Sequence, residues 1–405
     1  MKFLSPLERN WVLYDVGNSA FILMVTTVLP VYFRSLTDGA GLSGSEYFSA
    51  WGMAMTLSTL LIVLFGPLLG RLADQRGRRE VFLATVVFAV AASLSFPFFS
   101  HWRSFLVAFI LAKAGYNASL IVYDSMLVDV TSEERMDRVS AMGYAFGYIG
   151  SVIPFLMSLA LILFGEGLGL SMKVIMPLVF LINGLWWLFC SLPLAGSYRQ
   201  VYRESASLSW RELFKTFGEI PKNPPLFLFL LSFFFYIDGV YTIINMATAY
   251  GESLGLDSTG LLLALLVTQI VAFPASLTFG VLSKRVPSQR LIFVAILAYA
   301  AIALFAVQLD TLTEFWILAV AVGCFQGGIQ ALSRSHYAKL IPQEQSGEYF
   351  GIYDIFGKGA SILGTFLVSS VTAITGTQSV AIGALALLFL VGLILFAASL
   401  RAAAR

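Results

Sequence analysis

Charge is scarce in this 405-residue chain, and the shortage limits what kind of protein it can be. The 25 Lys and Arg and the 23 Asp and Glu residues make up 12% of the sequence, while apolar residues make up 58%. Soluble proteins carry about twice that charged fraction and about 45–50% apolar residues. So few charges cannot cover the surface of a soluble protein of this length. We therefore exclude a soluble enzyme and expect a protein that lies in the lipid bilayer.

Other shortages exclude further classes. The two cysteines, Cys190 and Cys324, both lie in apolar stretches and cannot build a disulfide framework. The two histidines, His101 and His336, stand alone, and the sequence has no Gly-x-x-x-x-Gly-Lys-Ser/Thr loop for ATP. The net charge is only +2 and the basic residues are not clustered, which disfavours a nucleic-acid partner. We expect no metal, no cofactor and no nucleic acid.

Twelve apolar stretches are long enough to cross a bilayer as helices. They cover residues 12–33, 48–69, 81–100, 104–130, 139–164, 174–194, 226–250, 259–281, 291–308, 314–340, 349–374 and 379–400. An even number of crossings places both termini on one side, which receives eighteen Lys and Arg residues against three on the other. Cytoplasmic loops carry the excess of basic residues. The sequence thus predicts an all-α multi-pass protein of the plasma (inner) membrane with both termini cytoplasmic.

One long polar loop divides the chain. We predict a six-helix bundle over 1–194, a cytoplasmic linker over 195–225 and a second six-helix bundle over 226–405. Within the linker, Ser209 and Glu212 have capping-box spacing, and apolar residues then repeat at helical intervals. This pattern predicts an amphipathic helix over 210–220 on the inner membrane surface. The alternative is a loosely ordered linker, because the segment is short.

The two halves share a pattern of residues at a constant offset of 210 positions. The matching pairs are Gly70 and Gly280, Ser125 and Ser335, Glu134 and Glu344, and Gly147 and Gly357. One offset in separate loops indicates a duplicated six-helix unit. Because each unit has an even number of spans, the axis relating the copies runs along the membrane normal.

The loop after the second predicted span carries the most specific motif. Residues 70–79 read Gly-Arg-Leu-Ala-Asp-Gln-Arg-Gly-Arg-Arg, which closely resembles the G-x-L-A-D-x-x-G-R-[RK] signature of the major facilitator superfamily. Asp74 can accept hydrogen bonds from free amide groups at the start of a neighbouring helix, and we place Asp74 and Arg78 in a gate. The alternative is an ordinary basic cytoplasmic loop. The corresponding loop of the second half has Lys284 in place of Asp74.

Further motifs resemble those of the autophagy-related vacuolar amino-acid effluxer family and its bacterial relatives. They are Tyr-Asp-Val-Gly-Asn-Ser-Ala-Phe at 14–21, Tyr-Ile-Asp-Gly-Val at 236–240, Gln-Ala-Leu-Ser-Arg-Ser at 330–335 and Phe-Gly-Ile-Tyr with Gly-Lys over 350–358. This resemblance implies export of an amino acid or peptide. This chain departs from the family's Y-N-x-x-L-P-D pattern at residues 123–129. Asp124 stands where the family has Asn, and Val128 stands where it has Pro. We therefore predict only that the substrate is a small organic solute.

Charged residues within the membrane cost several kcal/mol and require partners or a function. Asp238 falls near the centre of its span and is the strongest candidate for a proton carrier or a partner of a substrate amine; a structural hydrogen bond is the alternative. Asp354 and Lys358 are four residues apart and can neutralise each other. The full set of candidate substrate- or proton-binding residues is Asp15, Asn18, Lys113, Asn117, Asp238, Asn245, Gln326, Gln330, Asp354 and Lys358.

Asp124 and Arg334 are separated by the same offset of 210 and should therefore lie at equal depth in the membrane. We predict that they form a salt bridge between the halves that closes the cytoplasmic side. The full set of predicted gating residues is Asp74, Arg78, Asp124, Asp129 and Arg334. The alternative is that each residue pairs within its own half, Arg334 with Asp354.

These observations predict a proton-coupled secondary active transporter that acts as a monomer on a small organic solute. A lipid or lysolipid flippase on the same scaffold is the alternative. An intramembrane aspartyl protease is disfavoured, because Tyr14-Asp15 lacks the Gly-x-Gly-Asp partner that such enzymes require.

Overall fold

The computed structural model describes residues 4–203 and 209–404, and these residues are almost entirely helical. The first half contains α1 (Pro6–Gly39), α2 (Gly44–Arg76), α3 (Arg78–Leu94), η1 (Phe96–Phe98), α4 (Trp102–Ser125), α5 (Leu127–Val130), α6 (Glu133–Phe164), η2 (Glu166–Leu168) and α7 (Met172–Ser197). The remainder contains α8 (Trp210–Glu219), η3 (Ile220–Lys222), α9 (Pro224–Ser253), α10 (Ser258–Leu282), α11 (Ser288–Phe305), η4 (Ala306–Gln308), α12 (Leu312–Leu340), η5 (Gln343–Gln345), α13 (Ser346–Thr375) and α14 (Gln378–Ala403).

Twelve helices in the described ranges are long and apolar enough to cross a membrane, which confirms the predicted spans. Several helices extend well beyond the predicted limits. The first prediction began at residue 12, whereas α1 begins at Pro6, because Ser5 and Glu8 form a capping box at its start. Arg135 also binds the Glu8 carboxylate at 2.6 Å. Hydropathy detects only the part of a helix inside the bilayer and misses polar ends held in this way.

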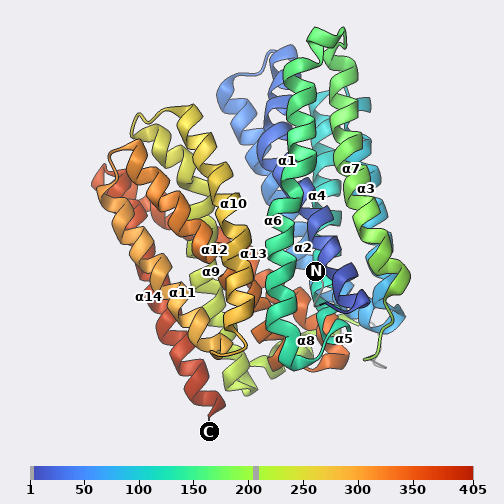
Figure 1. Cartoon of the computed structure of the whole chain (residues 1–405), viewed down its shortest axis with the longest axis vertical. Helices are drawn as coiled ribbons and strands as arrows, with labels where there is room; N and C mark the ends of the chain where they lie inside the picture. Colours follow the sequence, from blue (N-terminus) through green and yellow to red (C-terminus); the bar gives the residue numbers. More distant parts are fainter. Residues whose placement is uncertain (1–3, 204–208, 405) are drawn as a thin grey trace.

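The repeat is confirmed by the boundaries of the elements. Helices α3 and α11 begin at Arg78 and Ser288, and α4 and α12 begin at Trp102 and Leu312, each pair 210 residues apart. The short 3₁₀ helices η1 and η4 keep the same offset. Figure 1 shows the resulting two groups of helices, α1 to α7 and α9 to α14, standing side by side.

The amphipathic linker helix is present as α8, with a different cap from the one predicted. The Ser209 hydroxyl accepts from the Arg211 amide instead of forming the predicted box with Glu212. Leu213 is buried, while Trp210 and Phe214 remain 46% and 69% exposed. Arg211 and Lys215 are balanced by Glu212 and Glu219, and the exposed aromatic side of this amphipathic helix fits contact with a membrane surface.

The two ends of the bundle differ in their packing. Because the chain crosses twelve times, α1 begins and α14 ends at the same end, which we call the terminal end. At this end, α2 packs closely on α13 and α6 packs on α10. The other end, called the opposite end, carries the links between α1 and α2, α3 and α4, and α9 and α10.

Candidate functional site

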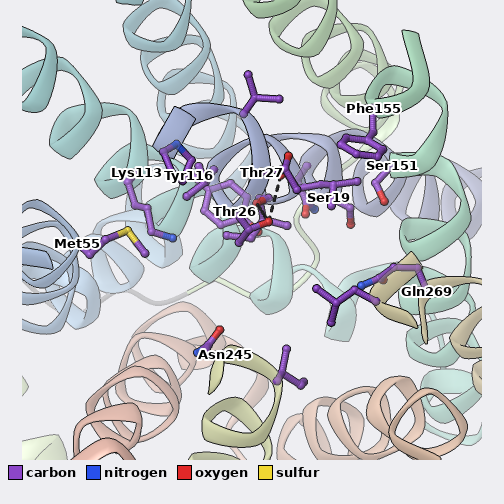
Figure 2. Close-up of a pocket in the computed structure, with 18 of the residues that line it drawn as sticks. Ser19, Thr26, Thr27, Met55, Lys113, Tyr116, Ser151, Phe155, Asn245 and Gln269 are labelled. Carbon is purple, nitrogen blue, oxygen red and sulfur yellow. Dashed lines mark hydrogen bonds between the residues drawn. The ribbon is translucent and has the colours of Figure 1, made fainter. Parts of the chain in front are cut away.

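A cavity of about 2220 Å³ lies between the two groups of helices. Its walls come from both halves and reach the opposite end at Ser100, Lys173 and Glu252. Its deepest polar residues include Asp124 and Arg334, beyond which the terminal end is closed. Figure 2 shows polar side chains from both halves, among them Lys113, Asn245 and Gln269, around one open space.

Nine of the ten predicted substrate- or proton-binding residues line this cavity. They are Asp15, Asn18, Lys113, Asn117, Asn245, Gln326, Gln330, Asp354 and Lys358. Their positions on α1, α4, α9, α12 and α13 explain why they converge, since each helix turns a polar stripe towards the space between the halves.

Asp238 is the exception, because it does not line the cavity, and its predicted role as a partner of a substrate amine stays a prediction. Its side chain is fully buried within the second half and is not part of the cavity wall. Oδ1 accepts from the Thr242 hydroxyl at 3.4 Å, while Oδ2 has no hydrogen-bond partner among the described residues. Its burial within the second half separates the carboxyl group from the cavity. Its role as a proton carrier stays a prediction.

Arg334 closes the cavity at the terminal end. Its Nη1 donates to Asp124 Oδ1 at 2.8 Å, so the ion pair predicted from the offset is confirmed. Its Nη2 lies 3.4 Å from Asp15 Oδ2. The alternative partner, Asp354, instead binds Lys358 at 2.6 Å. One buried guanidinium therefore joins α12 of the second half to α1 and α4 of the first.

Sequence reasoning missed four residues that hold Arg334 and its partners. The guanidinium lies over the rings of Trp11 and Tyr144, 4.6 Å from each centroid, and its Nε donates to the Ser140 hydroxyl at 2.9 Å. The Tyr123 hydroxyl donates to Asp15 Oδ2 at 2.7 Å. Tyr123 belongs to a motif that the sequence analysis recognised. Nothing in the sequence indicated a role for Trp11, Tyr144 or Ser140, because aromatic and hydroxyl residues are common in helices.

Asp74 accepts hydrogen bonds at the start of a neighbouring helix, as predicted, and this helix belongs to the other half. Its carboxylate accepts from the amides of Gly347 and Glu348 at 2.9 Å each, at the start of α13. Arg78 donates to the same carboxylate at 2.8 Å. A carboxylate at a helix N-terminus satisfies free amide groups and interacts favourably with the helix dipole.

Asp129, another of the predicted gating residues, binds the same arginine as Asp74. Arg78 Nη1 donates to its Oδ2 at 2.6 Å, and the Tyr198 hydroxyl donates to the same oxygen. Burial raises the pKa of Tyr198, which lies just past the end of α7, well above its ordinary value. The hydroxyl therefore keeps its proton and remains a donor. Asp129 lies on the short helix α5, which follows α4 after a single intervening residue.

Glycines allow α2 and α13 to touch at the terminal end, and we call this contact between the two helices the seam. A Cβ on Gly70 would lie 1.9 Å from the Gly347 carbonyl oxygen, and a Cβ on Gly351 would lie 2.4 Å from Pro67 Cα. Both obstacles are backbone atoms, which cannot rotate away. The closed terminal end therefore depends on the absence of side chains at these positions.

We expect Gly70→Ala to separate α2 from α13 and to destabilise the closed terminal end by at least about 1–3 kcal/mol, the usual cost of overpacking. Spin labels on the exposed positions Arg76 and Glu344 measure this separation, and a thermal melt measures stability. Gly196→Ala is the matched control, because a Cβ there meets no atom within 4 Å. Unchanged label distances in Gly70→Ala would contradict the seam.

The fold and the cavity together define the class of the protein. Two six-helix bundles related by a repeat, with a polar cavity between them, form the architecture of major facilitator transporters. Residues 45–403 match the family described as vacuole effluxer Atg22 like. The chain therefore belongs to this family of the major facilitator superfamily, and it is a multi-pass membrane transporter.

The relatives agree with this assignment. The chain is 40% identical to the MFS-type transporter YxiO of Bacillus subtilis over 98% of its own length and 95% of that protein. It is 23% identical to autophagy-related protein 22 of Kluyveromyces lactis over 80% of the chain and 73% of that protein. Matches to several other fungal relatives span about half of those longer proteins.

Solved structures share the fold. The fucose:proton symporter of E. coli superposes with a TM-score of 0.75 at 15% identity, covering 97% of each chain. The human organic anion transporter MFSD10 superposes with a TM-score of 0.74 at 15% identity, covering 96% of this chain and 98% of its own.

Proposed function

We propose that the protein is a proton-coupled secondary transporter that exports an amino acid or a similar small solute across the plasma membrane. The terminal end is assigned to the cytoplasm by its excess of basic residues. The cavity then faces the outside, and alternating access requires the terminal end to open. Since one chain supplies both walls of the cavity, a monomer is sufficient.

The observation that carries this proposal is the separation of charge along the cavity. At its floor, Asp15 and Asp124 face a single cation, Arg334, which leaves one negative charge. Further up the wall, Lys113 and the ion pair of Lys358 with Asp354 leave one positive charge. A zwitterion complements both. A zwitterionic lipid headgroup carries the same two charges, and the transport assay separates it from a free solute.

Purified protein in liposomes tests the proposal. Uptake of labelled amino acids is compared with translocation of a fluorescent phospholipid, each with and without a pH gradient. We expect amino-acid transport that depends on the gradient. Translocation of the lipid alone would contradict the proposal and favour a flippase, and amino-acid flux that ignores the gradient would remove proton coupling.

We expect Asp238→Asn to abolish gradient-driven uptake while the protein still inserts and folds. A carboxyl group with an unpartnered oxygen is costly to keep charged at this depth, and the amide cannot exchange a proton. Uptake is measured between pH 5 and 8, with counterflow at equal pH as a second assay that needs no gradient. Asp310→Asn, on an exposed loop, is the control. Wild-type uptake across this pH range would exclude Asp238 from coupling.

A further inference from the structure

Lys113 carries a buried charge that the gate does not use. It lies in the middle of α4, is only 8% exposed and lines the cavity. Figure 2 shows its side chain directed towards the open centre, with Asn245 approaching from the other half. Buried lysines in a membrane protein normally pair with a carboxylate, because an isolated charge is costly there.

The nearby carboxylates are engaged elsewhere. Asp354 binds Lys358 at 2.6 Å, and Asp15 and Asp124 bind Arg334. The contact that the described residues provide for the Lys113 ammonium is the ring of Tyr116, 5.7 Å away on the same helix. A cation–π contact compensates only part of the cost of a desolvated charge. The ammonium thus remains open to an anion in the cavity.

A second, independent observation lies one helical turn away. Asn117 is 2% exposed, lines the cavity, and its Nδ2 has no acceptor among the described residues. Residues four apart share one face of a helix, so this amide and the Lys113 ammonium present donors to the same region. On the cavity wall formed by α12, the Gln326 Nε2 is likewise buried without an acceptor.

We propose that Lys113 and Asn117 form the site that binds the carboxylate of the transported solute, an assignment that rests on the proposed function and specifies its substrate chemistry. A carboxylate offers two oxygens, one for the ammonium and one for the amide, and its single charge balances Lys113. A phosphate dianion fits less well, because phosphate sites usually combine several cations or an Arg fork.

The test uses the full chain purified in detergent and pairs of solutes that differ only in the proposed group. L-leucine, L-phenylalanine and L-glutamine are each compared with their α-carboxamides, and inorganic phosphate is a further probe. The readout is the solute concentration that produces half of the maximal thermal stabilisation. For at least one pair, we expect the carboxylate to act at a concentration at least about tenfold lower than its amide.

We expect Lys113→Met to abolish this preference by weakening the carboxylate at least about tenfold while leaving the amide unchanged, and Lys113→Arg to retain it. Lys113→Gln replaces the Met variant if that protein fails to fold. Lys173→Met is the matched control, because Lys173 lies exposed at the mouth of the same cavity. A merely structural lysine would affect both solutes of a pair equally.

Equal action of both forms on the wild type, a preference that survives in Lys113→Met, or stabilisation by phosphate alone would overturn the site. Uptake into liposomes separates its failure from that of the proposed function. If the carboxylate and the amide are transported alike, the proposed transport function is supported and the proposed carboxylate site is wrong. If neither is transported or bound, the proposed amino-acid function fails as well.

Discussion

Arg334→Met should lower transport by at least about 100-fold and open the terminal end. The substitution leaves Asp15 and Asp124 without their shared cation and deprives Trp11 and Tyr144 of the ring contacts. Removing one partner of a buried ion pair costs about 3–5 kcal/mol, which corresponds to roughly a 10²- to 10⁴-fold change in the ratio of closed to open forms. Because this group joins the halves, the closed form bears that cost.

The opening can be measured as a distance between spin labels at Ser132 and Arg285, exposed positions in different halves at the terminal end. Arg334→Lys should be nearly as defective, because an ammonium cannot reproduce the planar contacts of a guanidinium. Arg290→Met, at an exposed site on the same side, controls for the loss of a positive charge.

A double-mutant cycle of Asp124→Asn with Arg334→Gln tests the pair directly. Close charge pairs couple by about 1.5–7 kcal/mol in such cycles. We expect coupling within this range in the equilibrium between the closed and open terminal end. Additive effects would show that Asp124 and Arg334 act independently, whatever their separation in the closed form.

Asp74→Ala should slow turnover at least about tenfold while changing solute affinity less than about threefold. The substitution leaves two backbone N–H donors at the start of α13 without the carboxylate that accepts from them, and it removes one of the two carboxylates bound to Arg78. Each buried donor left unsatisfied costs about 1–3 kcal/mol. The closed terminal end is therefore destabilised, whereas the cavity, which excludes Asp74, keeps its lining.

Turnover is measured by counterflow, and affinity by thermal stabilisation with the same solute. Asp74→Asn gives a second reading, because it keeps one acceptor oxygen but loses the charge. Glu133→Ala, an exposed acidic residue at the terminal end, is the control. A large loss of affinity with unchanged turnover would place Asp74 in the binding site and contradict its role in the seam.

Both predictions concern contacts between residues that are far apart in sequence, and this limited what could be foreseen. The Asp124–Arg334 pair was predicted because a duplicated chain places equivalent residues at equal depth. For Trp11, Tyr144 and Ser140 no such relation exists. Asp129 was among the predicted gating residues, but its partners Arg78 and Tyr198 could not be foreseen, because they come from other segments of the chain.

The sequence by itself determined the twelve crossings, the duplication and the family, since each depends on hydropathy, on a constant offset or on a contiguous motif. It also identified nine polar residues that line the cavity, because a polar group within a bilayer is costly unless it has a partner or a function. Only the tertiary structure decided which of them face the cavity. Depth along a helix follows from the sequence, but the direction in which a side chain points depends on how neighbouring helices are rotated. In this structure the packing of the helices buries Asp238 outside the cavity wall and leaves Lys113 facing the cavity.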